Sequence, residues 1–111
     1  MFILVVDDLR IFAAPEDAVI HHARTSADAL TFLEENFGMI SEIWFDHDLG
    51  GTDDVMSVVR WLEEKAVNGE ANHITAIRIV TDNPVGYQKI AWLGQYFHIA
   101  PKPNHIGLIT D

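Results

Sequence analysis

Four short apolar runs in this chain each end in polar residues that suit phosphate or metal chemistry. The runs and their endings are Phe2–Val6 before Asp7-Asp8, Ile43–Phe45 before Asp46-His47-Asp48, Ile77–Val80 before Thr81, and Phe97–Ile99 before Pro101-Lys102-Pro103. If the runs are parallel strands of one sheet, all four endings lie on the same edge, where open parallel sheets bind ligands. The sequence therefore predicts one pocket that collects three carboxylates, a hydroxyl and an ammonium.

Strands and helices are expected to alternate along the chain. Further elements are predicted as a strand over Val19–Arg24, a helix from Thr25 or Ser26 to about Phe37, a helix from Thr52–Asp54 to Asn68-Gly69, a strand over Ile74–Thr81, a helix that Asn83 caps before Pro84, and a strand over Phe97–Ala100. Residues 9–17 are expected to form a loop, because they contain Pro15 and few periodic apolar positions. The tail from Asn104 is too short for a full closing helix. This order predicts one α/β domain over residues 1–111, an open parallel sheet with helices on its faces.

Composition narrows the class of protein. A chain of 111 residues with 49% hydrophobic content can form a real core. It has no cysteine, which excludes disulfides and thiolate metal sites, and no apolar stretch of the roughly 20 residues that a membrane span needs. The N-terminus opens as a strand, with no basic start or small-residue cleavage site, so we expect no secretory signal and take a cytoplasmic location as the default. The formal net charge of −10 opposes bulk binding to nucleic acid, although a bound cation can still recruit a small phosphate ligand.

The acidic endings of two runs are candidate metal ligands. Asp7, Asp8 and Asp46 supply hard carboxylate oxygens of the kind that hold Mg²⁺, with Mn²⁺ as an alternative. The competing interpretation is that Asp7 and Asp8 only terminate a strand and cap the next segment.

Basic and polar side chains near the same edge are candidates for binding phosphate. Lys102 has an ammonium suited to a phosphoryl oxygen or to the acidic cluster. Arg10 could clamp a phosphate with two hydrogen bonds, or pair with an acidic neighbour. Thr81 and Asn83 could donate hydrogen bonds to phosphate oxygens, or could cap the following helix, whose first N–H groups would then face an anion.

His47 has two interpretations of equal weight. If the strand has ended before it, its imidazole could act as a general acid to a leaving oxygen, oriented by a neighbouring aspartate. Otherwise the ring packs under a helix and forms a hydrogen bond with the backbone. Under the first interpretation the catalytic group consists of Asp46, His47 and Lys102.

These motifs resemble those of receiver domains in two-component signalling. The acidic pair Asp7-Asp8, a phospho-acceptor aspartate at Asp46, Thr81 and Lys102-Pro103 match the pattern of that class. A closer resemblance is to the cyclic-phosphate-processing receiver family, whose motifs resemble Asp7-Asp8-x-Arg10, Arg24-Thr25, Asp46-His47-Asp48-Leu49-Gly50 and Thr81-x-Asn83-Pro84-x-Gly86. The chain departs from that family at residues 11–15, where the proline comes late, and at Val80-Thr81, where the family often has His-Ser.

The resemblance implies a flavodoxin-like receiver fold. Its five-stranded parallel sheet would have the order 2-1-3-4-5, with the first helix reduced and the last helix missing or truncated. It also implies three possible functions. The first is metal-dependent processing of a cyclic phosphate on a nucleotide or RNA end, as a possible cyclic phosphoesterase. The second is a phosphoacceptor switch at Asp46, and the third is a degenerate receiver that acts as a binding or inhibitor module. The expected partner is a phosphate-containing small molecule or nucleic-acid end, with no membrane and a possible homodimer.

Overall fold

The computed structural model describes residues 1–81, 83–97, 102 and 103. Its elements are β1 (Phe2–Val6), β2 (Val19–Ala23), α1 (Ser26–Asn36), the 3-10 turn η1 (Phe37–Met39), β3 (Glu42–Phe45), α2 (Met56–Val67), β4 (Ala76–Ile79), α3 (Pro84–Ala91), α4 (Leu93–Phe97) and the two-residue β5 (Lys102–Pro103). The N-caps of two helices are those expected, because the Thr25 hydroxyl accepts from the Asp28 N–H and the Asn83 side chain accepts from two N–H groups of α3. The alternation of strands and helices confirms the predicted α/β class. The strand pairs described next confirm the parallel sheet.

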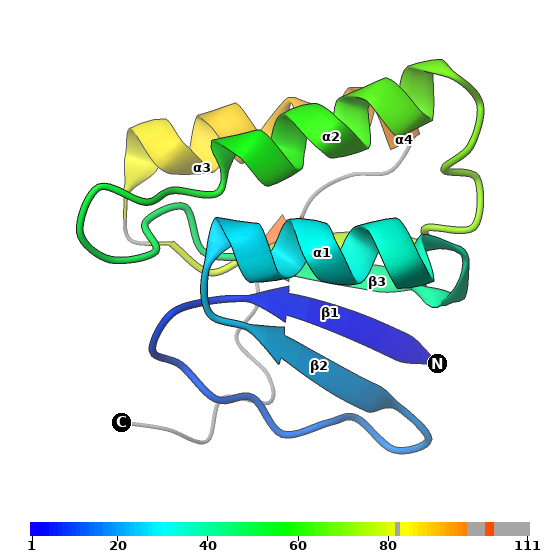
Figure 1. Cartoon of the computed structure of the whole chain (residues 1–111), viewed down its shortest axis with the longest axis horizontal. Helices are drawn as coiled ribbons and strands as arrows, with labels where there is room; N and C mark the ends of the chain where they lie inside the picture. The colour runs from blue at the N-terminus through cyan, green and yellow to red at the C-terminus, as the bar shows by residue number, and fades with distance from the viewer. Residues whose placement is uncertain (82, 98–101, 104–111) are drawn as a thin grey trace.

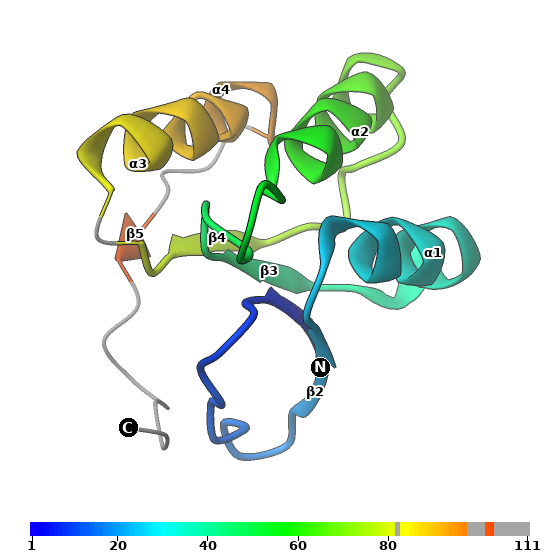
Figure 2. The same cartoon turned by 60° about the vertical axis from the view of Figure 1, so that its left-hand side comes forward.

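The strand order is β2-β1-β3-β4, with β5 paired beside β4, and all pairs are parallel. In the sheet, β2 lies on one side of β1, whereas β3, β4 and β5 follow one another on the other side. The crossover from β1 to β2 therefore runs in one direction across the sheet, and every later crossover runs in the opposite direction. Because crossovers between parallel strands are right-handed, all the later helices must lie on one face of the sheet. Figures 1 and 2 show α1, α2, α3 and α4 together on that face. The one connection that reaches the other face has no helix, which confirms the expectation that residues 9–17 form a loop.

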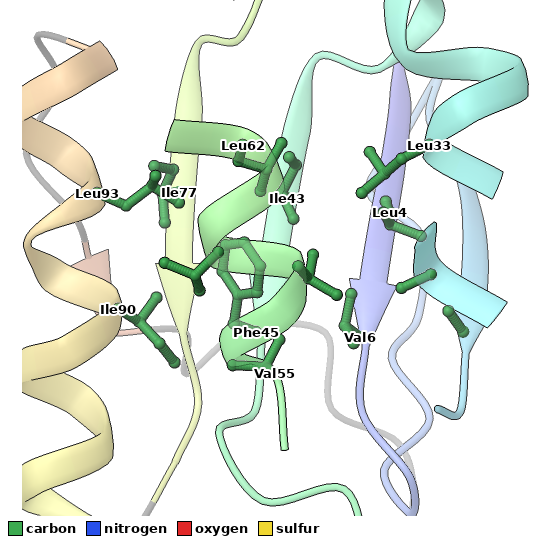
Figure 3. Close-up of a cluster of buried hydrophobic side chains, with 14 of the residues drawn as sticks. Leu4, Val6, Leu33, Ile43, Phe45, Val55, Leu62, Ile77, Ile90 and Leu93 are labelled. Atoms are coloured by element: carbon green, nitrogen blue, oxygen red, sulfur yellow. The ribbon is translucent and has the colours of Figure 1, made fainter. Parts of the chain in front are cut away.

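The main core lies between the sheet and these helices. Alternate residues of β1 and β3 point into it, among them Leu4, Val6 and Phe45. Figure 3 shows them packed against Leu33 of α1 and Leu62 of α2, with further contributions from α3 and α4. This packing fixes the relative positions of the strand ends that carry the polar residues.

The opposite face of the sheet is covered by the loop between β1 and β2. Phe12 of this loop is buried against Ile3, Val5 and Trp44, and its ring meets the Trp44 ring edge-on at a centroid distance of 5.4 Å. The Phe12 side chain thus covers part of the sheet face that has no helix. Figure 2 shows the loop passing on the side of the sheet away from the helices.

The starts predicted for the second long helix and for the fifth strand were wrong, and β4 is shorter than the predicted Ile74–Thr81. Helix α2 begins at Met56 instead of residues 52–54, because Asp48 and Asp54 form an antiparallel bridge that closes residues 48–54 into a loop. The turn of that loop uses Gly50 and Gly51, both with positive φ. Phe97, expected to begin the fifth strand, instead ends α4, and residues 98–100 lie outside the described part of the chain.

Candidate functional site

The acidic residues after β1 and β3 meet at the switch point of the sheet. Val6 and Phe45 are register partners, so Asp7 and Asp46 follow the two strands side by side. The Asp46 N–H donates to the Val6 carbonyl at 2.8 Å, which extends the pairing by one residue. One carboxylate oxygen each from Asp7, Asp8 and Asp46 lies within 4.8 Å of the others. The predicted convergence of these three carboxylates therefore occurs.

Two of the three carboxylates in this cluster are buried. Asp7 is fully buried and Asp46 is 8% exposed, whereas Asp8 is partly exposed. Burial and the neighbouring Asp7 carboxylate raise the pKa of Asp46, while Arg10, the Asp48 N–H and the Thr81 hydroxyl act in the opposite direction. Buried carboxylates need a compensating cation, and three hard oxygens suit a divalent one. The donor set therefore meets the requirements for holding such an ion.

Arg10 provides positive charge inside the cluster. One of its terminal nitrogens donates to Asp7 Oδ2 at 3.2 Å and to Asp46 Oδ2 at 3.1 Å. The other oxygen of Asp7 accepts the Leu9 and Arg10 backbone N–H groups at 3.0 and 2.9 Å. Of the two roles expected for Arg10, the structure shows the ion pair.

Arg24 is a site residue to which sequence reasoning gave no role. It directly follows β2, and its guanidinium donates to the backbone carbonyls of Asp7 and Arg10 at 3.1 and 2.8 Å. It thereby ties the start of the β1–β2 loop to the neighbouring strand. The available signal was its place at the end of a strand beside β1, where its side chain reaches the same edge.

Gly50 is a second residue that was not recognised. Its φ is +89°, and a Cβ added there would lie 3.2 Å from Asp8 Oδ2. The loop after β3 thus approaches the acidic cluster closely where only glycine fits without strain. Two adjacent glycines, Gly50 and Gly51, are the signal of a turn in the sequence, but they do not show what the turn contacts.

His47 packs against α3. A Cβ on Gly86 would lie only 2.5 Å from His47 Cγ, so the helix rests directly on the ring. His47 Nδ1 lies 3.0 Å from Asp48 Oδ1, and this hydrogen bond holds the pKa of Asp48 below its ordinary value. His47 Nε2 is buried and has no hydrogen-bond partner among the described residues. The ring therefore packs under a helix, but its partner is a carboxylate instead of the backbone.

The N-terminus of α3 is already capped within the chain. Asn83 Oδ1 accepts the Val85 and Gly86 N–H groups, both at 3.1 Å, and Asn83 Nδ2 reaches Asp48 Oδ2 at 3.5 Å. These N–H groups were expected to face an anion, and they donate to the Asn83 side chain. Asn83 thus connects the α3 cap to the loop after β3.

Thr81 and Lys102 come from the strands beyond β3. The Thr81 hydroxyl accepts the Asn83 N–H at 3.2 Å, and its proximity to Asp46 lowers the pKa of that carboxyl, against the larger effect of burial. Lys102 lies on β5 opposite Arg78 of β4, so it belongs to the strand that it was expected to follow. The orientation of its side chain lies outside what the structure describes.

A parallel sheet with an acidic pair after β1, an aspartate after β3 and a hydroxyl after β4 defines a receiver-type domain. The sequence model of the cyclic-phosphate processing receiver domain matches residues 2–94. The chain therefore belongs to the cyclic-phosphate processing receiver family, as its motifs predicted. No curated protein gives a significant match. Among the described residues, no helix has the length and apolar character to cross a bilayer.

Proposed function

We propose that this domain binds a cyclic phosphate on a nucleotide or RNA end and opens it in a metal-dependent reaction. The observation that carries the proposal is the cluster of Asp7, Asp8 and Asp46 oxygens with the Arg10 guanidinium between two of them. Such a cluster could hold a divalent cation, and a phosphate ester is a natural ligand of a site that combines a cation with an arginine.

Charge balance favours a phosphodiester as the ligand. The three carboxylates and the two arginines Arg10 and Arg24 together carry one net negative charge. A divalent cation converts this to one net positive charge, which matches the single negative charge of a cyclic phosphate. Asp7, Asp8 and Asp46 would hold Mg²⁺ or Mn²⁺, which neutralises charge on phosphoryl oxygens and lowers the pKa of a bound water.

The reaction would add one water to the cyclic ester. An oxygen–phosphorus bond forms to the water, one ring P–O bond breaks, and the released hydroxyl takes up a proton, leaving a monoester. Arg10 would bind the phosphoryl oxygens, with Thr81, Asn83 and Lys102 as further candidates. The His47 ring lies under α3, which favours a positioning role through Asp48 over a role as the proton donor.

The test is turnover of 2′,3′-cyclic nucleotides with Mg²⁺, followed by ³¹P NMR of the ring-opened monoester. Asp46→Asn and Asp7→Asn should abolish turnover, because each removes a carboxylate from the cluster. Asp28→Asn removes an exposed carboxylate from α1 and should leave turnover unchanged. Turnover that survives loss of Asp46 would contradict the proposal.

A phosphoacceptor switch is the second candidate. The observation that favours it is the position of Thr81. The Val80 N–H donates to the Phe45 carbonyl at 2.9 Å, so Thr81 and Asp46 follow neighbouring strands, and a hydroxyl there could sense a phosphoryl group. Incubation with acetyl phosphate and Mg²⁺, followed by intact mass, should then show one phosphoryl adduct that Asp46→Asn lacks. Absence of both turnover and adduct would leave a binding or inhibitor module, including a homodimer, as the remaining candidate.

A further inference from the structure

We propose that Arg10 is an internal counter-cation, which occupies the acidic cluster until a divalent cation enters and then moves to the phosphate. This inference rests on the proposed function and specifies how the site is regulated. Its basis is that Arg10 donates to one oxygen each of Asp7 and Asp46, two of the three carboxylates of the cluster. The arginine would therefore act as a competitor of the metal and, after displacement, as a ligand of the phosphate.

The competition follows from the way in which Asp7 is bonded. Asp7 Oδ1 already accepts two backbone N–H groups, from Leu9 and Arg10. Its other oxygen, Oδ2, is the better placed to bind a cation, and Arg10 donates to it at 3.2 Å. The same guanidinium nitrogen also donates to Asp46 Oδ2 at 3.1 Å. A metal ion that uses both Oδ2 atoms must displace this nitrogen.

The backbone of Arg10 is anchored independently of its guanidinium. Its backbone N–H is held by Asp7 Oδ1, and its backbone carbonyl is held by Arg24 at 2.8 Å. The side chain itself is 30% exposed, whereas that of Asp7 is fully buried. The loop can therefore keep its position while the guanidinium moves outward toward solvent.

A phosphate at the cluster offers the displaced guanidinium a new partner. The planar donors of arginine match two phosphoryl oxygens, which makes the exchange favourable once an anion is present. Metal and phosphate should then bind with positive coupling, and the coupling must be reciprocal. In the absence of phosphate, Arg10 should weaken metal binding.

The first measurement is Mg²⁺ affinity by calorimetry in phosphate-free buffer, for the wild type, Arg10→Gln and Arg60→Gln. Arg10→Gln should bind Mg²⁺ roughly tenfold tighter or more, because a competing positive charge is removed. Arg60 is exposed on α2, so Arg60→Gln makes the same change in net charge away from the site and should bind as the wild type does.

The second measurement repeats the titrations with inorganic phosphate present. Phosphate should tighten Mg²⁺ binding severalfold in the wild type and should have little effect in Arg10→Gln. If Arg10→Gln fails to fold, Arg10→Lys decides the question, because one ammonium bridges the two carboxylates less well than a guanidinium. Arg10→Lys should then bind Mg²⁺ more tightly than the wild type.

The outcomes separate the two proposals. If the wild type binds Mg²⁺ but the Arg10 variant binds it equally or more weakly, Arg10 is no competitor and the inference is overturned alone. If phosphate coupling persists in Arg10→Gln, the transfer of Arg10 to phosphate is overturned. If neither protein binds Mg²⁺ or Mn²⁺, the metal-dependent function fails as well.

Discussion

Replacing Gly86 with alanine tests how closely α3 rests on the loop after β3. The added methyl group would lie 2.5 Å from His47 Cγ, 2.7 Å from His47 Cβ and 3.0 Å from His47 Cδ2. These are atoms near the root of a buried side chain, so the ring cannot easily move aside. The clash must be relieved by shifting the helix or the loop.

The expected size follows from two opposing terms. Overpacking a close contact costs about 1–3 kcal/mol, and alanine recovers roughly 0.5–1 kcal/mol of helix propensity relative to glycine. We therefore expect the free energy of unfolding to fall by about 1–2 kcal/mol. For a domain of this length that corresponds to a Tm lower by roughly 4–8 °C.

Thermal unfolding followed by circular dichroism measures this loss, with Gly38→Ala as the matched control. A Cβ on Gly38 meets nothing within 4 Å, and its φ is not positive, so that variant should unfold near the wild-type Tm. In a His47→Ala background the ring is absent, and Gly86→Ala should cost less. A Gly86→Ala protein that is as stable as the wild type would refute the packing argument.

Two further predictions concern the sheet face without helices and the acidic cluster. Phe12→Ala should lower the free energy of unfolding by about 3–5 kcal/mol, because Phe12 is 3% exposed in the folded protein. It should also shift Trp44 fluorescence to the red, because Phe12 covers Trp44. The control Ile11→Ala, at a 42% exposed position, should change neither quantity appreciably. Asp46→Asn should raise the Tm in EDTA near pH 7, because a pKa raised in the folded state means that the ionised carboxylate destabilises the fold, and this penalty grows as the pH rises through that pKa. Thermal scans from pH 4 to pH 8 measure this effect, and a lower Tm for Asp46→Asn across that range would contradict it.

Much of the fold could be predicted because its signals are local. The capping residues Thr25 and Asn83 and the apolar runs of β1 and β3 act over a few residues, where propensity and periodicity are informative. The start of α2 was missed because a bridge between Asp48 and Asp54 extends the loop before it. Such a contact depends on how the loop folds back, which no periodic pattern encodes.

The chain order by itself determined that Asp7 and Asp46 would meet, since parallel strands present their carboxyl ends at one edge. It also supplied the family, through motifs that the match over residues 2–94 confirmed. Only the tertiary structure decided which side chains share that edge. Arg10 bridges two buried carboxylates, Arg24 fixes the loop beside them, and His47 turns under α3. Each outcome depends on distances of a few ångströms between segments remote in the chain, and these are set by packing across the whole sheet.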